Sequence, residues 1–255
     1  MMTRISKPWR SASLVVATAV LALTLLAQPV AAQSDGFRHT LELYLMGPSM
    51  SGTVGMGALE SEIDVPSSTI FDNLEFAALA DYRGESDTWA VLADVVVMNL
   101  GASGTGSAGR GAADVDADEL IVELVGAYRI SSSFEVLAGA RYTGLQTRVE
   151  LTTPGLEREA EVSDSWIDPI VGAQAFVPLA ETIQLQVRGD IGGFGVGCDF
   201  TWQAMARVNW QVSRVVRLGV GYRVLDQDYE SGSGSDAFAW NVVTQGPLLA
   251  AGVTF

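Results

Sequence analysis

Residues 199–212 read DFTWQAMARVNWQV, and apolar side chains alternate with polar ones along the stretch, Met205 being the exception on the polar side. Successive side chains of a β-strand point to opposite faces, so this period of two gives one apolar and one polar face. A typical strand has about 5–6 residues, whereas a tilted strand needs about 9–11 residues to cross a bilayer. The stretch therefore predicts a strand that is long enough to span a membrane.

The same alternation recurs elsewhere in the chain. It is clear at 182–191 and 216–224, and it is weaker at 134–142 and 38–46. Beyond residue 32 the sequence holds no run of about 18 apolar residues, which excludes a helical membrane protein. The chain ends in a further alternating segment that closes with Phe255.

A soluble β-sandwich also alternates, but three features favour a membrane barrel. The runs reach 10–14 residues, and their polar faces mix glycine, arginine and carboxylates, as expected in a crowded lumen. Aromatic side chains gather toward the ends of the runs, as in the girdles of outer-membrane barrels. These aromatic residues are Trp89, Tyr128, Trp166, Trp202, Trp210, Tyr222, Tyr229 and Trp240.

We therefore predict an all-β fold, a transmembrane antiparallel β-barrel of about 10–12 strands. A short helix is expected near one barrel mouth, because Pro66 and two serines precede apolar residues with helical spacing within 65–74. The segments with strand character are 37–46, 52–60, 73–84, 87–99, 117–130, 134–149, 164–177, 182–192, 198–212, 214–226 and 238–255.

The number of strands stays open between ten and twelve. Outer-membrane barrels have an even number of strands, short periplasmic turns and long outer loops. Ten strands remain if 52–60 belongs to the first outer loop, and twelve result if 238–255 folds as a hairpin at 245–247. The pattern at 52–60 favours twelve. Placement of the long connections outside favours ten; these are expected at 100–116, 152–163 and 227–237.

The first 32 residues have the pattern of a secretory signal peptide. A basic start is followed by an apolar core at 14–26 and by small residues up to Ala32, before a predicted cleavage site. The expected organisation is a signal peptide at 1–32 and an outer-membrane β-barrel domain at 33–255. Both features indicate the outer membrane of a Gram-negative bacterium.

The charge balance limits the possible partners. Three of the 15 basic residues and none of the 30 acidic residues fall within 1–32, which leaves 12 arginines, no lysine and a net charge of −18. Such a chain has no basic surface for nucleic acid. Arginine suits fixed carboxylate pairs, because its planar fork donates two parallel hydrogen bonds. The composition predicts an ordered, ion-paired interior.

Specific arginine and aspartate residues are expected to form this interior. They fall on the polar faces of predicted strands, and charges in a narrow lumen are costly unless they are paired. Opposite charges on neighbouring strands should form a ladder, which would be structural or would act as a selectivity constriction. The candidate lumen residues are Arg141, Asp168, Arg188, Asp190, Arg207, Arg217 and Arg223.

No catalytic, cofactor or metal site is expected. His39 is the sole histidine and falls on the apolar face of its strand, near the predicted periplasmic rim. Asp114, Asp116 and Asp118 have the opening spacing of a calcium loop, but Glu119 stands where that loop needs glycine. This acidic segment is interpreted as a solvated loop. Cys198, the single cysteine, is expected to be a buried or loop thiol.

Two glycine-containing motifs carry a resemblance. The segments WIDPIVG at 166–172 and GDIGGFGVG at 189–197, together with the terminal Phe255, resemble a group of largely uncharacterised proteobacterial outer-membrane β-barrel proteins. The resemblance implies location and fold, and it brings no established activity. The ending also resembles the C-terminal signal that the barrel assembly machinery reads, so this machinery, outer-membrane lipid and lipopolysaccharide are the expected partners.

The function expected from the sequence is non-enzymatic. A barrel of this size leaves room for side chains and a narrow channel, so the protein is expected to be structural or to be a porin-like channel for small solutes. The alternatives are a lipid-modifying outer-membrane enzyme and a surface interaction protein that acts through its long loops.

Overall fold

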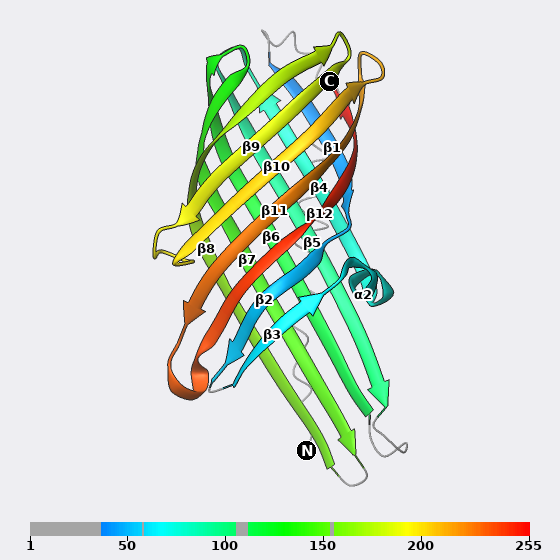
Figure 1. Ribbon diagram of the computed structural model, residues 1–255, viewed down its shortest axis with the longest axis vertical. Helices are drawn as coiled ribbons and strands as arrows, with labels where there is room; N and C mark the ends of the chain where they lie inside the picture. The colour runs from blue at the N-terminus through cyan, green and yellow to red at the C-terminus, as the bar shows by residue number, and fades with distance from the viewer. Residues whose placement is uncertain (1–36, 58, 106–111, 154–155) are drawn as a thin grey trace. The chain divides into compact units, whose positions relative to one another are not determined.

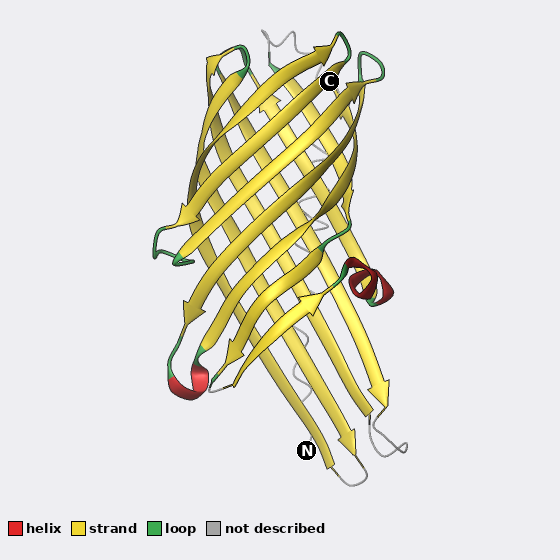
Figure 2. Cartoon of the chain, viewed as in Figure 1, coloured by secondary structure: helices red, strands yellow, loops and turns green. Residues whose placement is uncertain are grey.

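The computed structural model describes residues 37–57, 59–105, 112–153 and 156–255. The predicted signal peptide at 1–32 lies outside the described residues. Strands dominate the described part of the chain (Figure 2), which also holds two short helices. The elements are β1 (Arg38–Met46), β2 (Ser49–Met56), β3 (Leu59–Val65), α2 (Ser67–Asp72), β4 (Leu74–Glu85), β5 (Trp89–Thr105), β6 (Ala112–Ser131), β7 (Phe134–Thr153), β8 (Leu156–Ala180), β9 (Ile183–Gly193), β10 (Phe200–Gln211), β11 (Val216–Ser231), η2 (Gly234–Asp236) and β12 (Phe238–Thr254).

Ten of these strands close into an antiparallel barrel (Figure 1). From β4 to β12 each strand pairs with the next along the chain, and β1 closes the ring by pairing with both β4 and β12. The strands β2 and β3 form a hairpin attached to β12, which pairs with β1 through 248–254 and with β2 through 238–245. Of the two strand counts left open by the sequence, ten is therefore correct, and 52–60 belongs to the connection between the first two barrel strands. The hairpin at 245–247 is not formed, because β12 runs through it unbroken.

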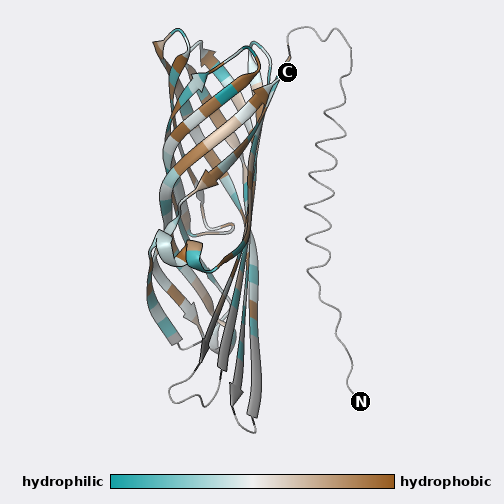
Figure 3. Ribbon diagram, turned by 90° about the vertical axis from the view of Figure 1, so that its right-hand side faces the viewer, coloured by the Kyte–Doolittle hydropathy of each residue, from teal (hydrophilic) through white to brown (hydrophobic). Residues whose placement is uncertain are grey.

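The barrel has polar side chains inside and apolar side chains outside, as the alternation predicts. In β10 the buried side chains are those of Thr201, Gln203, Arg207 and Asn209, whereas Phe200 and Trp210 are half-exposed. Hydrophilic and hydrophobic residues alternate along the visible strands (Figure 3). A soluble sandwich would bury the apolar face instead. The exposed apolar face is therefore the surface that meets lipid.

The two ends of the barrel differ. One end, the short-turn end, carries residue 37, Phe255 and the tight turns after β4, β6, β8 and β10. The opposite end, the long-strand end, carries the connections after β5, β7, β9 and β11 (Figure 1). Short turns face the periplasm in outer-membrane barrels, so the long-strand end faces outward.

The long outer loops expected from the sequence are largely strand, and this prediction was wrong. The strands β6, β7 and β8 have 20, 20 and 25 residues, about twice the length that crosses a bilayer. Hairpin pairing continues above the membrane because each added residue pair satisfies main-chain hydrogen bonds in water as well. The connections after β5, β7 and β11 are only 106–111, 154–155 and 232–237, and the acidic segment at 114–118 belongs to β6.

The predicted short helix is confirmed at α2, between β3 and β4. It follows Pro66, whose fixed φ suits the start of a helix. Ile70 is its buried residue, and it packs against Met50, Met98 and Val242 inside the barrel wall. Within the described ranges, no helix has the length and apolar character needed to cross a bilayer.

Candidate functional site

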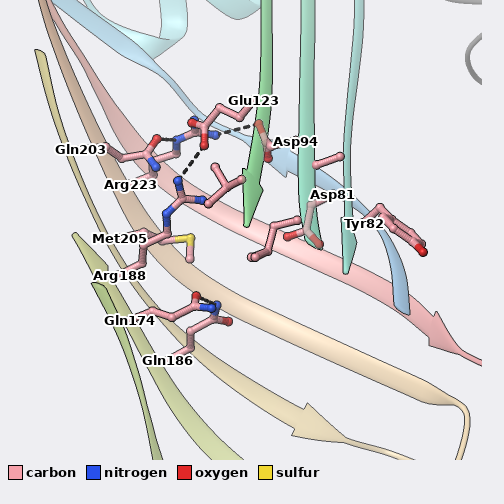
Figure 4. A pocket seen from close by; sticks show the side chains of 13 residues that line it. Asp81, Tyr82, Asp94, Glu123, Gln174, Gln186, Arg188, Gln203, Met205 and Arg223 are labelled. Carbon is pink, nitrogen blue, oxygen red and sulfur yellow. Dashed lines mark hydrogen bonds and ion pairs between the residues drawn. The ribbon is translucent and has the colours of Figure 1, made fainter. Parts of the chain in front are cut away.

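Three arginines converge on one carboxylate in the middle of the lumen. Glu123 of β6 accepts a hydrogen bond on Oε2 from Arg188 Nη2 at 2.7 Å. Its Oε1 accepts two more, from Arg141 Nε and from Arg223 Nη2, each at 3.1 Å. The arginines come from β7, β9 and β11 (Figure 4 shows Arg188 and Arg223 beside Glu123). Glu123 is 1% exposed, so the carboxylate is removed from bulk water.

Two more carboxylates complete this layer. Asp190 accepts hydrogen bonds from Arg141 Nη2 at 2.7 Å and from Arg188 Nε at 3.0 Å. Asp94 lies 3.3 Å from Arg223 Nη1 and accepts a hydrogen bond from the Tyr44 hydroxyl at 2.9 Å. We call this group the central charge layer; its members are Asp94, Glu123, Arg141, Arg188, Asp190 and Arg223.

Strand periodicity and register create the central charge layer. Arg188 and Asp190 are two residues apart on β9, which places both on its inward face. Glu123 stands directly opposite Arg141 in the β6–β7 register. Three positive groups meet three negative groups, so the layer is formally neutral. Buried charges are tolerated only when they are paired and hydrogen-bonded, and here each one has at least two partners.

Little space remains within the central charge layer. The cavity among these side chains has a volume of about 40 Å³, room for about one to a few water molecules. Gln203 helps to fill it, because its Oε1 accepts from Arg223 Nε at 2.7 Å and its Nε2 donates to Asp190 at 3.1 Å. The described side chains therefore leave no wide path through this level of the barrel.

A second polar layer lies toward the short-turn end. Arg207 Nη1 is 2.7 Å from Glu42 and 3.5 Å from Asp81, and Arg217 Nη1 is 4.0 Å from Glu42. Nearer the rim, Arg83 and Arg129 share the carboxylates of Glu85 and Glu135. A polar cavity of about 250 Å³ opens among these residues.

The structure gathers most of the residues predicted to line the lumen. Arg141, Arg188, Asp190 and Arg223 meet in the central charge layer. Arg207 and Arg217 lie in the second layer, where Glu42 joins them.

Asp168 stands apart from both layers, although it pairs with Arg141 in the β7–β8 register. It accepts hydrogen bonds from Trp166 Nε1 at 3.1 Å and from the Cys198 backbone N–H at 2.6 Å. Cys198 is fully buried in the connection after β9. Burial and the nearby Asp168 carboxylate raise the pKa of the Cys198 thiol, which stays protonated and unreactive at neutral pH.

Sequence reasoning missed the main carboxylate partners, Glu42, Asp81, Asp94 and Glu123. Glu123 sits in ELIVELVG at 119–126, where apolar residues occupy both faces of the strand and hide the alternation. A charged residue surrounded by apolar ones was the available signal, because a lipid-facing carboxylate is costly.

The lumen is apolar at the long-strand end. A cavity of about 520 Å³ is lined there mainly by Met50, Val54, Ile63, Met98, Leu100 and Trp240. Beside it, Trp166 stacks on Tyr229 with ring centroids 4.0 Å apart. Across the described ranges, no group of three or more His, Cys, Asp or Glu side chains is arranged to hold a metal ion.

His39 lies at the short-turn end, as the sequence predicts. Its Nδ1 is hydrogen-bonded to the Tyr82 hydroxyl at 2.8 Å, and its ring stacks on Phe255 with centroids 5.5 Å apart. The ring of Phe37 meets it edge-on. These contacts describe an aromatic group at the barrel rim.

Comparison with known proteins identifies a class of fold and no family. No protein-family model and no curated protein matches the chain. Among solved structures, the outer membrane protease OmpT from Escherichia coli is 9% identical with a TM-score of 0.50, and the match covers 89% of this chain and 99% of that one. The translocator domain of the autotransporter NalP from Neisseria meningitidis is 10% identical with a TM-score of 0.43, covering 96% and 98%.

At such low identity the likeness to OmpT concerns the fold alone. Combined with the apolar exterior and polar interior, it defines the chain as an outer-membrane β-barrel. The protein is accordingly a component of the bacterial outer membrane. The resemblance of its two glycine-containing motifs to uncharacterised proteobacterial barrels stays a prediction.

Proposed function

We propose that this protein is a non-enzymatic barrel that serves the outer membrane as a structural element, with a lumen closed to solutes. The observation that carries the proposal is Glu123, which is held by three arginines from three different strands. The sequence left structural and channel roles open, and the central charge layer favours the structural one.

A conducting pore needs a continuous hydrated path. In the central charge layer the charged groups bind one another, and only about 40 Å³ stays free. Opening a path would separate Glu123 from at least one arginine, and an unpaired buried charge costs several kcal/mol. The closed state is therefore the stable state under this proposal.

The enzyme alternative has weaker support. Its predicted base, His39, is engaged by the Tyr82 hydroxyl and covered by the Phe255 ring. OmpT is a protease, but its sequence is only 9% identical to this chain, so the likeness gives no support for an activity here.

The proposed partners follow from the outer surface. Exposed apolar side chains such as Leu43, Leu124 and Val220 would contact lipid and lipopolysaccharide. Phe255 is 57% exposed at the end of β12, where the barrel assembly machinery would recognise it. Surface interaction stays a second candidate, because the long strands β6–β8 would present a projecting sheet to the medium.

Conductance of the purified protein in planar lipid bilayers tests the closed lumen. Wild-type protein is expected to insert without reproducible current steps. Combined Glu123→Ala, Arg141→Ala and Arg188→Ala substitutions remove much of the central charge layer and should produce steps. Arg38→Ala is the matched control, since Arg38 is 62% exposed at the barrel rim. Reproducible steps from the wild type, changed by Arg188→Ala alone, would establish the channel role instead.

A further inference from the structure

The apolar cavity at the long-strand end contains a carboxylate without a partner. Glu119 of β6 is 7% exposed and lines the cavity of about 520 Å³ together with Met98 and Trp240. It makes no hydrogen bond or ion pair with any residue in the described part of the chain. Arg223 acts on it only through its charge, since the Arg223 guanidinium is bonded to Asp94, Glu123 and Tyr44.

The other charged groups of the cavity are also acidic. Asp118 accepts a hydrogen bond from Asn99, and Asp164 accepts one from the Tyr229 hydroxyl at 3.2 Å. Glu60 is exposed at the edge of the cavity. No arginine occurs among the described residues that line this space. The lining therefore repels anions, including fatty acids. Glu119 is its buried hydrogen-bond acceptor that has no donor among the described residues.

The barrel wall has no backbone pairing between β3, which lines the cavity, and β4. Residues 74–79 of β4 pair with β5 but not with β1, whose pairing with β4 covers 80–85. On the other side β3 pairs with β2 alone. The free edges of β3 and β4 are joined in sequence by α2 (Figure 1). Residues 74–79 lie within about 12 residues of the short-turn end, so this unpaired wall is at the depth of the outer leaflet.

We propose that this cavity binds a small hydrophobic molecule that carries a protonated amine, with the ammonium group paired to Glu119. The volume of about 520 Å³ falls in the range of small-molecule sites, about 300–1,000 Å³. Burying an unpaired carboxylate in apolar surroundings is unfavourable, and a cationic ligand removes this cost while its chain covers Met98, Ile63 and Trp240. Molecules of this kind dissolve in the lipid and would reach the cavity between β3 and β4, past α2, whose Ile70 packs against Met50 and Met98 there.

Three ligands with one chain length separate the contributions of charge and chain. Octylamine, 1-octanol and octanoate are titrated into protein reconstituted in phosphatidylcholine nanodiscs, and binding is followed by tryptophan fluorescence, because Trp240 lines the cavity. The wild type is expected to bind octylamine about tenfold or more tightly than 1-octanol. Octanoate is expected to bind weakest of the three.

Two variants and one control assign the binding to Glu119 and to the cavity. Glu119→Gln should weaken octylamine binding by about tenfold or more and leave 1-octanol binding unchanged. Met98→Phe places a bulkier side chain in the cavity without adding a tryptophan and should weaken binding of both. Glu62→Gln removes the same charge from the exposed face of β3 and should change neither. The proposal would be overturned by equal affinity of the wild type for octylamine and 1-octanol, by tightest binding of octanoate, or by absence of binding. It would also be overturned if Glu119→Gln bound octylamine as tightly as the wild type does. The closed lumen would stand in any of these cases.

Discussion

The two halves of the lumen are built from the same strands but are filled in different ways. Toward the short-turn end, charged side chains bind one another, and the central charge layer leaves about 40 Å³ free. Toward the long-strand end, methionine, isoleucine and valine side chains line about 520 Å³. Ion pairs and hydrogen bonds are directional and fix long side chains across the lumen. Apolar side chains form no such directional bonds across the lumen, so the centre of this half stays open.

The largest expected effect comes from removing the hub of the polar half. Glu123→Ala leaves Arg141, Arg188 and Arg223 without their shared acceptor and is expected to lower the free energy of unfolding by about 3–5 kcal/mol. Urea unfolding in detergent micelles, followed by tryptophan fluorescence, measures the change. Glu119→Gln is the control, because Glu119 lies four residues away on the same inward face of β6. It should cost less than about 1 kcal/mol, and equal losses would contradict the contrast between the two halves.

A smaller effect is expected from the apolar half. Met98 is 7% exposed and packs against Ile70, Met50 and Val242. Met98→Ala should lower the free energy of unfolding by about 2 kcal/mol, at the low end for such truncations because Met98 already borders a cavity. The same urea titration applies. Val196→Ala, at a position 73% exposed in the connection after β9, should change little, and a loss of similar size there would show that truncation alone lowers stability.

The smallest effect is expected at a polar site within the long-strand end. Cys198 is fully buried, yet its surroundings are polar because of Asp168 and Trp166 Nε1. Cys198→Ser supplies a hydroxyl that donates to Asp168, so the expected change is less than about 1 kcal/mol. Cys198→Val has a similar size and no donor and should cost more. If serine proves as harmful as valine in thermal unfolding, the site is apolar, like the cavity at the same end of the barrel.

Alternation predicted the fold because in β9, β10 and β11 one face meets lipid and the other meets a polar lumen. It fails where the lumen itself becomes apolar. The valines at 95–97 of β5 occupy both faces of the strand, and the apolar run around Glu123 in β6 does the same. The projecting ends of β6–β8 were missed for the opposite reason, since their sequence is largely polar and shows no alternating apolar face.

The candidate site was predicted in part. Arg188 and Asp190 stand in a clearly alternating strand, which made their inward position readable from the sequence. Their partner Glu123 was hidden, because the pairing of β6 with distant strands across the lumen depends on the closure of the barrel. Glu119 was considered only as a residue that departs from a calcium loop. Its isolation within an apolar cavity is a property of the assembled walls and leaves no local pattern.

The closing strand of the barrel has a mechanical consequence. The strand β1 is held to β4 only through Arg38–Leu43 and to β12 only through Thr40–Met46, whereas β11 and β12 are joined along 216–231. Among the ten strands of the closed ring, β1 has the fewest backbone pairs, so a pulling force or a rise in temperature meets the least resistance of the ring at this strand. Rupture would begin at this strand and would release the arginines of the second layer from Glu42 before it reached Glu123.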